Sequence, residues 1–333
     1  MNVNPRPADA QAIEEAARRL AGGELVAFPT ETVYGLGADA ASARAIAEVY
    51  RLKGRPADHP LIVHVLDAAQ AAWWAHWPAR AQRLADAFWP GPLTLVLVRR
   101  ETAPAFACGG QASIGLRAPS HPVARALLAA FAARGGHGVA APSANRFGRV
   151  SPTRAAHVID DLGVEAPLVL DGGACEVGVE STIVDLSRER PVLLRPGGIT
   201  IAQLEAVLGE PVPGRDARAP RASGTLEAHY APVTPVELVD GDGIDRRIAG
   251  LHARGERVAL WARSGAGARA DARLSMPADP TAAAHALYDA LRTLDRSGCT
   301  RILVERVPGD ASWHAVADRL RRSAAGPGGV AEA

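Results

Sequence analysis

At 333 residues the chain could form one large core, but two domains are the more usual arrangement at this length. Its 37 basic and 36 acidic residues give a net charge of +1, which argues against a tight nucleic-acid binder. The three cysteines lie far apart without a CxxC pair, so we expect neither a disulfide framework nor a zinc site. No apolar run reaches membrane-spanning length, and the sequence predicts a soluble, cytoplasmic protein.

The first 200 residues alternate irregularly between helix and strand patterns. Helices are predicted over residues 9–21, 42–51, 68–88, 121–133 and 200–208, and strands over 24–28, 61–65, 93–98, 113–119, 168–170, 178–185 and 191–194, with a short one ahead of Ser143. Residues 30–37 are predicted as a loop, which either makes a plain turn or lets a ligand approach its backbone. Some strands follow one another through turns, so we expect an α/β fold with a twisted mixed sheet.

The composition changes at residue 210. Residues 210–235 are dominated by Pro, Gly, Arg and Ser and predict a linker, in which Tyr230 either tips a flap or docks on a neighbouring surface. Further on, strands over 236–239, 257–261 and 301–304 alternate with helices over 242–254, 281–295 and 313–323, a smaller Rossmann-like α/β array. We therefore predict a domain over 1–209, a linker or lid over 210–235 and a second domain over 236–333.

Lys53 is the only lysine, since every other one of the 37 basic residues is arginine. The planar fork of arginine cannot replace a compact ammonium that acts as a point charge. Arg55 follows two residues on, and in an extended segment both cations would project to the same side. We interpret the pair as a clamp for a polyanion; the alternative is a solvated surface lysine retained by chance.

Other polar residues occur at the ends of predicted strands. Arg117 shares a strand face with Ser113 and is a candidate for capturing a carboxylate or phosphate, or for a surface ion pair. Ser143 and Asn145 could bind phosphate, ribose or metal-bound water, or could cap the helix that follows residue 151. The remaining members of the set are Thr32, His64, Ser151, Ser181 and Arg195.

This set of cations and hydroxyls favours a phosphorylated anionic ligand. No Ser-His-Asp or Cys-His arrangement stands out, and carboxylates are scarce in these motifs, which disfavours covalent or two-carboxylate catalysis. Phosphoryl or nucleotidyl transfer by positioning and charge stabilisation, helped by Mg²⁺, is the better hypothesis.

Five motifs together resemble the YrdC family. They are FPTETVYGLG at 28–37, Lys53-Gly54-Arg55 with PLIVH at 60–64, SIGLRAP at 113–119, APSAN at 141–145 and ESTIVD at 180–185. The linker and second domain resemble the long, two-domain form of the family, by architecture and by His229-Tyr230-Ala231-Pro232. The resemblance implies that L-threonine, bicarbonate or CO2, and ATP give L-threonylcarbamoyl-adenylate and pyrophosphate. That product would pass to the machinery that forms threonylcarbamoyladenosine in tRNA, with weak or indirect tRNA contact.

The resemblance also implies roles for individual residues. Lys53 and Arg55 would be catalytic. ATP would be bound by Arg55, His59, Ser113, Ser143, Asn145, Ser151, Arg195 and Tyr230, and L-threonine by Thr32, His64, Arg117, Ala141 and Ser181. Mg²⁺ would be held through the ATP phosphates rather than by protein ligands. One departure is His59, because the family usually has asparagine there, and a contact through His59 would depend on pH.

Two other classes of function are open to a chain with this resemblance. One is an RNA-binding module of the same fold, which needs a basic stripe that a net charge of +1 with scattered arginines does not favour. The other is a carbamoyltransferase of hydrogenase maturation, which would carry zinc-finger cysteines and an acylphosphatase segment that this sequence lacks.

Overall fold

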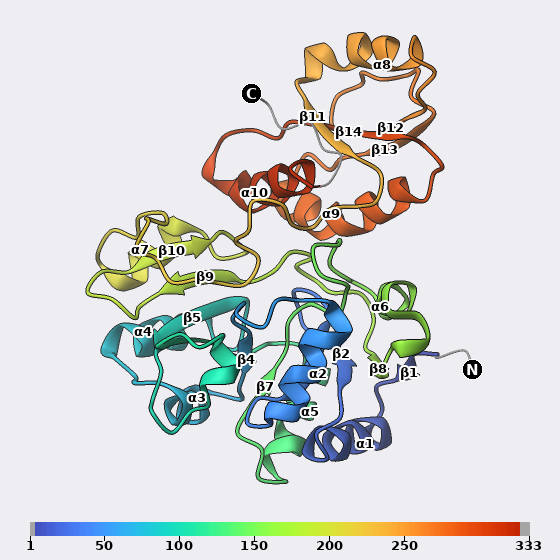
Figure 1. Cartoon of the computed structure of the whole chain (residues 1–333). Coiled ribbons are helices and arrows are strands. Elements are labelled where there is room, and N and C mark those ends of the chain that lie inside the picture. The colour runs from blue at the N-terminus through green and yellow to red at the C-terminus, as the bar shows by residue number, and fades with distance from the viewer. Residues whose placement is uncertain (1–3, 327–333) are drawn as a thin grey trace. The chain divides into compact units, whose positions relative to one another are not determined.

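The computed structural model describes residues 4–326, and the chain divides into two compact units (Figure 1). The first unit takes in Met1–Phe147 and Pro152–Thr225, and the second takes in Gly148–Ser151 and Leu226–Ala333. The division after Thr225 falls inside the range 210–235, so the first part of that range folds with the first unit.

The first unit is built on a ten-stranded mixed sheet, in the order β1-β8-β2-β3-β7-β4-β6-β5-β9-β10. The strands are β1 Arg6–Pro7, β2 Val26–Phe28, β3 Gly35–Asp39, β4 Ile62–His64, β5 Leu93–Val98, β6 Ser113–Arg117, β7 Val139–Ala140, β8 Leu168–Asp171, β9 Thr182–Asp185 and β10 Val192–Arg195. The sheet contains both parallel pairs, such as β4 with β6, and antiparallel pairs, such as β5 with β6, which confirms the predicted mixed sheet.

Seven helices accompany this sheet within the described residues. They are α1 Ala10–Ala21, α2 Ala43–Lys53, α3 Ala68–Trp74, α4 Ala79–Phe88, α5 Pro122–Ala132, α6 Ala155–Leu162 and α7 Ile201–Leu208, with short 3₁₀ turns η1 Ala105–Cys108 and η2 Gly163–Glu165. The side chains of Asp9, Ser42 and Thr200 accept hydrogen bonds from the first turns of α1, α2 and α7. Such caps contribute about 1 kcal/mol each and explain why these helix starts could be predicted.

Apolar side chains cover both faces of the sheet. A large cluster that includes Leu36, Leu95 and Leu116 packs with helices such as α2, and a second cluster joins α1 and α5 to Phe28 and Leu170. Because the central strands are buried on both faces, they appear in the sequence as continuous apolar runs rather than as alternating patterns.

Two local predictions for this unit are wrong, and one of the alternatives left open for Ser143 and Asn145 is ruled out. Residues 68–88 form two helices, α3 and α4, because Pro78 has no backbone N–H and Ala75 pairs with Arg99 instead. The last three residues of the predicted loop 30–37 are the start of β3. Ser143 and Asn145 do not cap the next helix, since α6 begins at Ala155.

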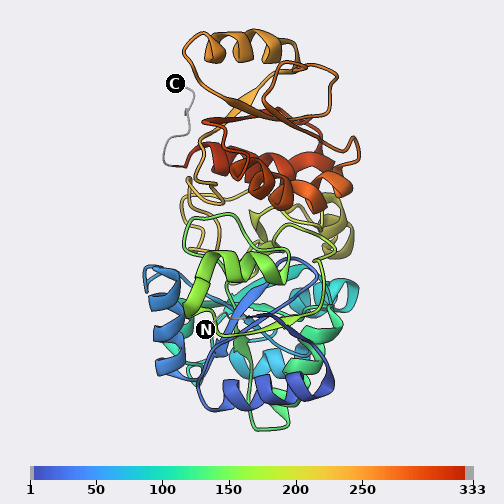
Figure 2. The ribbon, with the colours of Figure 1, turned by 90° about the vertical axis from the view of Figure 1, so that its right-hand side faces the viewer.

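The second unit contains a four-stranded parallel sheet in the order β11-β14-β12-β13, which confirms a Rossmann-like α/β array. Its strands are β11 Val236–Val239, β12 Val258–Ala262, β13 Ala272–Ser275 and β14 Arg301–Glu305. Its helices are α8 Ile244–His252, α9 Pro280–Asp295 and α10 His314–Ala324, with 3₁₀ turns η3 Gly241–Gly243 and η4 Ala311–Trp313. Figures 1 and 2 show α8 on one face of this sheet and α9 and α10 on the other.

β13 was not predicted, because its short ARLS sequence lies at the sheet edge and lacks an apolar run. Cys108, Cys175 and Cys299 are buried and form no disulfide. Within residues 4–326, no helix has the length and apolarity needed to cross a membrane.

Candidate active site

The centre of the candidate site lies where the parallel strands β4 and β6 end side by side. Their register pairs His64 with Arg117, and both residues are buried. Arg117 Nη2 lies 2.7 Å from Glu31 Oε1, in an ion pair whose side chains are only 5% and 3% exposed. Glu31 Oε2 also accepts a hydrogen bond of 3.1 Å from the backbone N–H of Ser120. The loop before β3 and the end of β6 are therefore held together by one buried carboxylate.

The electrostatics of this centre follow from that burial. Burial opposes ionisation of Glu31, but the attraction of Arg117 outweighs it and lowers the pKa of the carboxyl below its ordinary value. Burial, reinforced by the charge of Arg117, lowers the pKa of His64 to about 3, so the imidazole is neutral at physiological pH. The site thus combines one guanidinium, one carboxylate and one neutral imidazole.

Four buried polar atoms at this centre have no hydrogen-bond partner among the described residues. Glu31 Oε1 and Arg117 Nη2 have their mutual ion pair, whereas Arg117 Nε and His64 Nδ1 have no such contact. Buried polar atoms are almost always paired in native proteins, so each exception needs an explanation. A small ligand with an anionic group would pair with Arg117 and could exchange a hydrogen bond with His64.

Hydroxyl groups lie on the segments next to this centre. Thr32 is fully buried and its Oγ1 lies 2.9 Å from Thr30 Oγ1. Ser181, just before β9, has its Oγ 2.7 Å from Thr94 Oγ1 of β5. Ala141 is buried beside β4, where its backbone N–H donates to Ile62 O. His64 and Arg117 end β4 and β6, Thr32 precedes β3, Ala141 follows β7 and Ser181 precedes β9. In the sheet order β3-β7-β4-β6-β5-β9, the residues predicted to bind threonine therefore lie on or beside neighbouring strands.

Lys53 is the last residue of α2 and its ammonium is buried. Its Nζ donates to the backbone oxygens of Ser143 and Asn145, each at 2.5 Å. Burial, and then the charge of Arg55, lower the pKa of Lys53 well below its ordinary value. The expectation that Lys53 and Arg55 share one extended segment is wrong, because Gly54 ends the helix in the left-handed region at φ 63°. The geometry makes Lys53 an anchor for the segment of Ser143 and Asn145.

That segment is fixed from two further directions. Ser143 forms a bridge with Gly35 of β3, and the backbone N–H of Ala144 donates to Tyr34 O. On the other side, the N–H of Phe147 donates to Lys53 O. Asn145 is buried. The Ser-x-Asn and Lys-x-Arg motifs therefore support one another directly.

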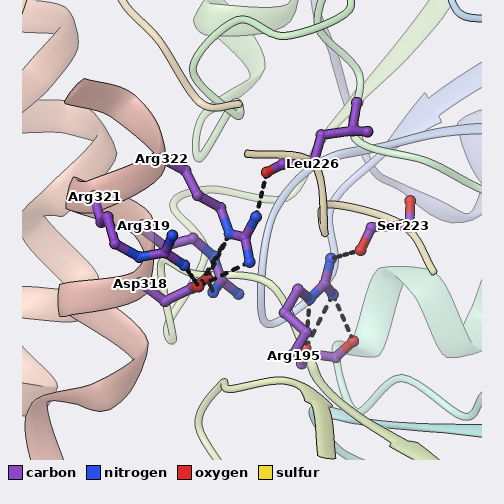
Figure 3. Close-up of polar contacts among 8 residues, drawn as sticks. Arg195, Ser223, Leu226, Asp318, Arg319, Arg321 and Arg322 are labelled. Carbon is purple, nitrogen blue, oxygen red and sulfur yellow. Dashed lines mark hydrogen bonds and ion pairs between the residues drawn. The ribbon is translucent and has the colours of Figure 1, made fainter. Parts of the chain in front are cut away.

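Two of the predicted ATP ligands contact the part of the linker that folds with the first unit. Arg55 Nη2 donates to Pro60 O at 2.9 Å and to Ser223 Oγ at 3.2 Å. Arg195 Nη1 donates to Ser223 O at 2.9 Å, and its other nitrogens contact Ser181 (Figure 3). Arg221 pairs with Asp58, two residues before Pro60.

These linker residues close a pocket between β4, β5, β6 and β9. It is lined by Ser113 and Gly115 among others, and by Arg221 and Ser223 from the linker. A volume of about 10 Å³ leaves room for roughly one water molecule. Ligand pockets usually measure about 300–1,000 Å³, so a nucleotide could enter here only if residues 221–223 moved.

The other predicted ATP ligands are distributed as follows. The rings of His59 and Phe147 meet edge to face, with their centroids 5.5 Å apart. The hydroxyl of Tyr50 donates to the backbone oxygen of His59. Burial, and then the charge of Arg55, lower the pKa of His59. Ser151 and Tyr230 are buried and belong to the second unit.

Sequence reasoning missed Glu31, Arg221 and Ser223. Glu31 was passed over because carboxylates looked scarce, although it stands between two threonines in a motif that was singled out. The signal that could have found it is the need of a buried arginine for a counter-charge. Nothing in the sequence marks Arg221 or Ser223 among the other polar residues of the linker.

The fold and the site define the class: a two-unit α/β protein whose first unit has a cationic, hydroxyl-rich site on a mixed sheet and whose second unit has a parallel sheet. A family model of the Sua5, YciO and YrdC proteins, described as "Telomere recombination", matches residues 18–197. A second model, described as "Threonylcarbamoyl-AMP synthase, C-terminal domain", matches residues 199–325. The chain therefore belongs to the Sua5/YciO/YrdC family, in its two-domain form, which confirms the resemblance seen in the sequence.

Similar proteins cover almost the whole chain. A relative from Pyrococcus abyssi, named threonylcarbamoyl-AMP synthase, is 40% identical over 324 residues, which is 93% of each chain. A relative of the same name from Bacillus subtilis is 39% identical over 327 residues, 94% of this chain and 93% of the relative. The crystal structure of P. abyssi Sua5 complexed with L-threonine matches with a TM-score of 0.87 and 39% identity, over 93% of each chain.

Proposed function

We propose that this protein is a threonylcarbamoyl-AMP synthase, an enzyme that makes L-threonylcarbamoyl-adenylate and pyrophosphate from L-threonine, CO2 or bicarbonate, and ATP. The product would supply threonylcarbamoyladenosine formation in tRNA. The relatives of this name support the proposal. Within the structure, the main support is the buried Arg117–Glu31 ion pair, beside which Arg117 Nε and His64 Nδ1 have no hydrogen-bond partner among the described residues. In chemical terms the enzyme is a nucleotidyltransferase that moves adenylyl from ATP to a carbamate.

L-threonine would bind at the ends of β4 and β6. Its carboxylate would pair with Arg117, whose buried Nε has no hydrogen-bond partner among the described residues. Its hydroxyl would hydrogen-bond to Thr32 or Ser181, both of which are buried, and His64 would contact it as a neutral imidazole. The crystal structure of P. abyssi Sua5, which is complexed with L-threonine, supports an amino-acid site in this fold.

ATP would bind beside threonine, against Arg55, His59, Ser113, Ser143, Asn145 and Arg195. The residues from the second unit that the resemblance assigns to ATP are Ser151 and Tyr230. Within the described residues no cluster of three or more His, Cys, Asp or Glu could hold a metal, and we propose that Mg²⁺ accompanies the ATP phosphates. When bound, Mg²⁺ would offset negative charge on the triphosphate.

The chemistry would proceed in two steps. The neutral amine of threonine attacks the carbon of CO2, so that a C–N bond forms while the π-electron pair of one C=O bond moves onto its oxygen. The nitrogen then gives a proton to water, which leaves the carbamate. A carbamate oxygen then attacks the α-phosphorus of ATP, and the bond from that phosphorus to the bridging oxygen breaks to release pyrophosphate. Arg55 and Arg195 would stabilise charge on the phosphates, while Lys53 would hold the Ser143–Asn145 segment in position.

The carbamate intermediate needs protection from water. Residues 221–223 cover the pocket that contains Ser113, and their contacts with Arg55 and Arg195 occupy two cations that ATP would need. We propose that this segment is a lid, which leaves those arginines when ATP enters and closes again over the bound substrates.

The test is pyrophosphate release by the purified full-length chain. We expect release from ATP only when L-threonine and bicarbonate are both present. L-threoninol, which lacks the carboxylate, should fail to replace threonine, because Arg117 would have no partner. Equal release without threonine, or with threoninol, would contradict the proposed function.

A further inference from the structure

Helix α10 of the second unit carries a cluster of arginines around one carboxylate (Figure 3). Asp318 lies 2.8 Å from Arg319 Nη1 and 3.0 Å from Arg322 Nε, and it also pairs with Arg321 at 3.1 Å. Arg319 is fully buried and Arg322 nearly so, whereas the Arg321 side chain is 62% exposed. Burial opposes ionisation of Asp318, but Arg319 and Arg322 outweigh it and lower its pKa. Two buried arginines are thus fixed in orientation by one aspartate.

Two consecutive residues of α10, Arg322 and Ser323, contact residues 226–230, which we call the linker tip. The guanidinium of Arg322 donates to Leu226 O (Figure 3), and its backbone oxygen accepts from the N–H of His229 at 3.2 Å. Ser323 Oγ donates to Tyr230 O at 2.8 Å. These contacts fix the backbone on both sides of residues 227–228.

The ring of Tyr230 is held by the same helix. The guanidinium of Arg319 lies 5.2 Å from the centre of that ring, and Tyr288 of α9 packs against it at 5.7 Å. A planar cation buried over an aromatic face interacts more strongly than one in water. Tyr230 itself is only 1% exposed.

The backbone of Tyr230 gives an independent indication that this placement is imposed. Its φ is 61°, in the left-handed region that residues with a Cβ seldom adopt, and it is the one non-glycine residue with positive φ within residues 4–326. Such a conformation persists only where the surroundings over-determine it, and it is common where a residue must be held ready for a ligand.

We infer that the second unit positions Tyr230 for ATP, with Arg319, Arg322 and Ser323 as the positioning residues and Asp318 as the group that orients the two arginines. None of these residues touches substrate; each acts through the linker tip. The inference rests on the proposed role of Tyr230 as an ATP ligand and gives the C-terminal unit a function in nucleotide binding. The opposite hypothesis, in which docking on α10 withholds Tyr230 from the nucleotide, predicts that loss of these contacts lowers the KM for ATP.

The experiment compares steady-state pyrophosphate release by full-length variants, with ATP varied at saturating threonine and bicarbonate. We expect Arg319→Met to raise the KM for ATP about tenfold, since it removes a buried cation–π contact, and Ser323→Ala to raise it about threefold, since it removes one hydrogen bond. The KM for threonine should change less than about twofold, because its proposed ligands all lie in the first unit. Arg321→Met is the matched control: it removes an exposed partner of the same Asp318 and should leave both constants unchanged.

A double-mutant cycle separates positioning from a general loss of structure. In a Tyr230→Ala background, Arg319→Met should add less than about a twofold further increase in the KM for ATP. The same tenfold effect in both backgrounds, or a lower KM for ATP in the single variants, would overturn the inference. If Arg319→Met does not fold, Ser323→Ala in the two backgrounds gives the same decision.

The outcome also distinguishes this inference from the proposed function. A wild-type chain without threonine-dependent pyrophosphate release would refute the proposed function. An active wild type whose Arg319 and Ser323 variants keep a normal KM for ATP would refute only the positioning role.

Discussion

Replacing Lys53 tests how the two signature motifs of the first unit cooperate. Its Nζ lies 2.5 Å from the backbone oxygens of both Ser143 and Asn145. A hydrogen bond to a charged group contributes about 1.5–3 kcal/mol, so Lys53→Met removes interactions worth about 3–6 kcal/mol. Because the ammonium is buried, the uncharged methionine also avoids a desolvation cost of several kcal/mol. We therefore expect the free energy of unfolding to fall by much less than the sum of the two bonds.

Activity should suffer more than stability. Without the ammonium, the Ser143–Asn145 segment loses its anchor on α2, and a displacement of about 1 Å in a catalytic group costs on the order of 10²-fold in rate. Lys53→Arg is the more informative variant, because it keeps the positive charge but places a larger guanidinium where the native side chain is only 2% exposed. Overpacking of this kind costs about 1–3 kcal/mol and should also shift the segment.

The assay is threonine-dependent pyrophosphate release, combined with thermal unfolding of each variant. Both Lys53 variants should lose roughly 100-fold in kcat/KM for ATP. Arg51→Lys is the matched control, since it changes a side chain of α2 that is 58% exposed. If Lys53→Arg keeps activity within about threefold of wild type, the anchoring role of the ammonium is refuted.

Three further predictions concern the threonine site and the lid. Glu31→Gln leaves Arg117 buried without a counter-charge, so the free energy of unfolding should fall by about 3–5 kcal/mol and the KM for threonine should rise; an unchanged KM would contradict the role of the pair. The pKa of His64 is about 6.5 in the unfolded chain but about 3 in the folded protein, so between these values only the unfolded chain takes up the proton. The free energy of unfolding should therefore fall as pH falls from 6.5 to 3, by up to about 1.4 kcal/mol per pH unit. In chemical denaturation, His64→Gln should flatten that decline, and parallel pH profiles would rule out a neutral buried imidazole. Arg221→Ala combined with Ser223→Ala removes lid contacts with Asp58 and Arg55, so ATP should be hydrolysed without equivalent product; tight coupling in this variant would argue against the lid.

Much of the fold could be predicted because its strands are buried on both faces and its helices carry local caps. Residues 93–98 show this well, since a run that is apolar except for Thr94 becomes β5 with the predicted bounds. β13 and the start of β3 could not be predicted, because glycine-rich or edge strands are specified by their neighbours rather than by their own sequence.

The site was predictable where strand alternation or motif spacing carries the information. Arg117 and His64 are examples, since each ends a strand that the sequence marks clearly. Glu31 and the true partners of Lys53 were not, because these contacts join residues that are 86 and at least 90 positions apart in the chain. Long-range pairing of this kind leaves no local pattern to read.

The most direct test of the whole account is incorporation of radiolabelled bicarbonate into an AMP-linked product by the purified protein. We predict a labelled threonylcarbamoyl-adenylate that forms only with both L-threonine and ATP, and that Arg117→Ala abolishes. Labelled adenylate that forms equally well without threonine, or no labelled adenylate from a folded wild-type chain, would contradict the account.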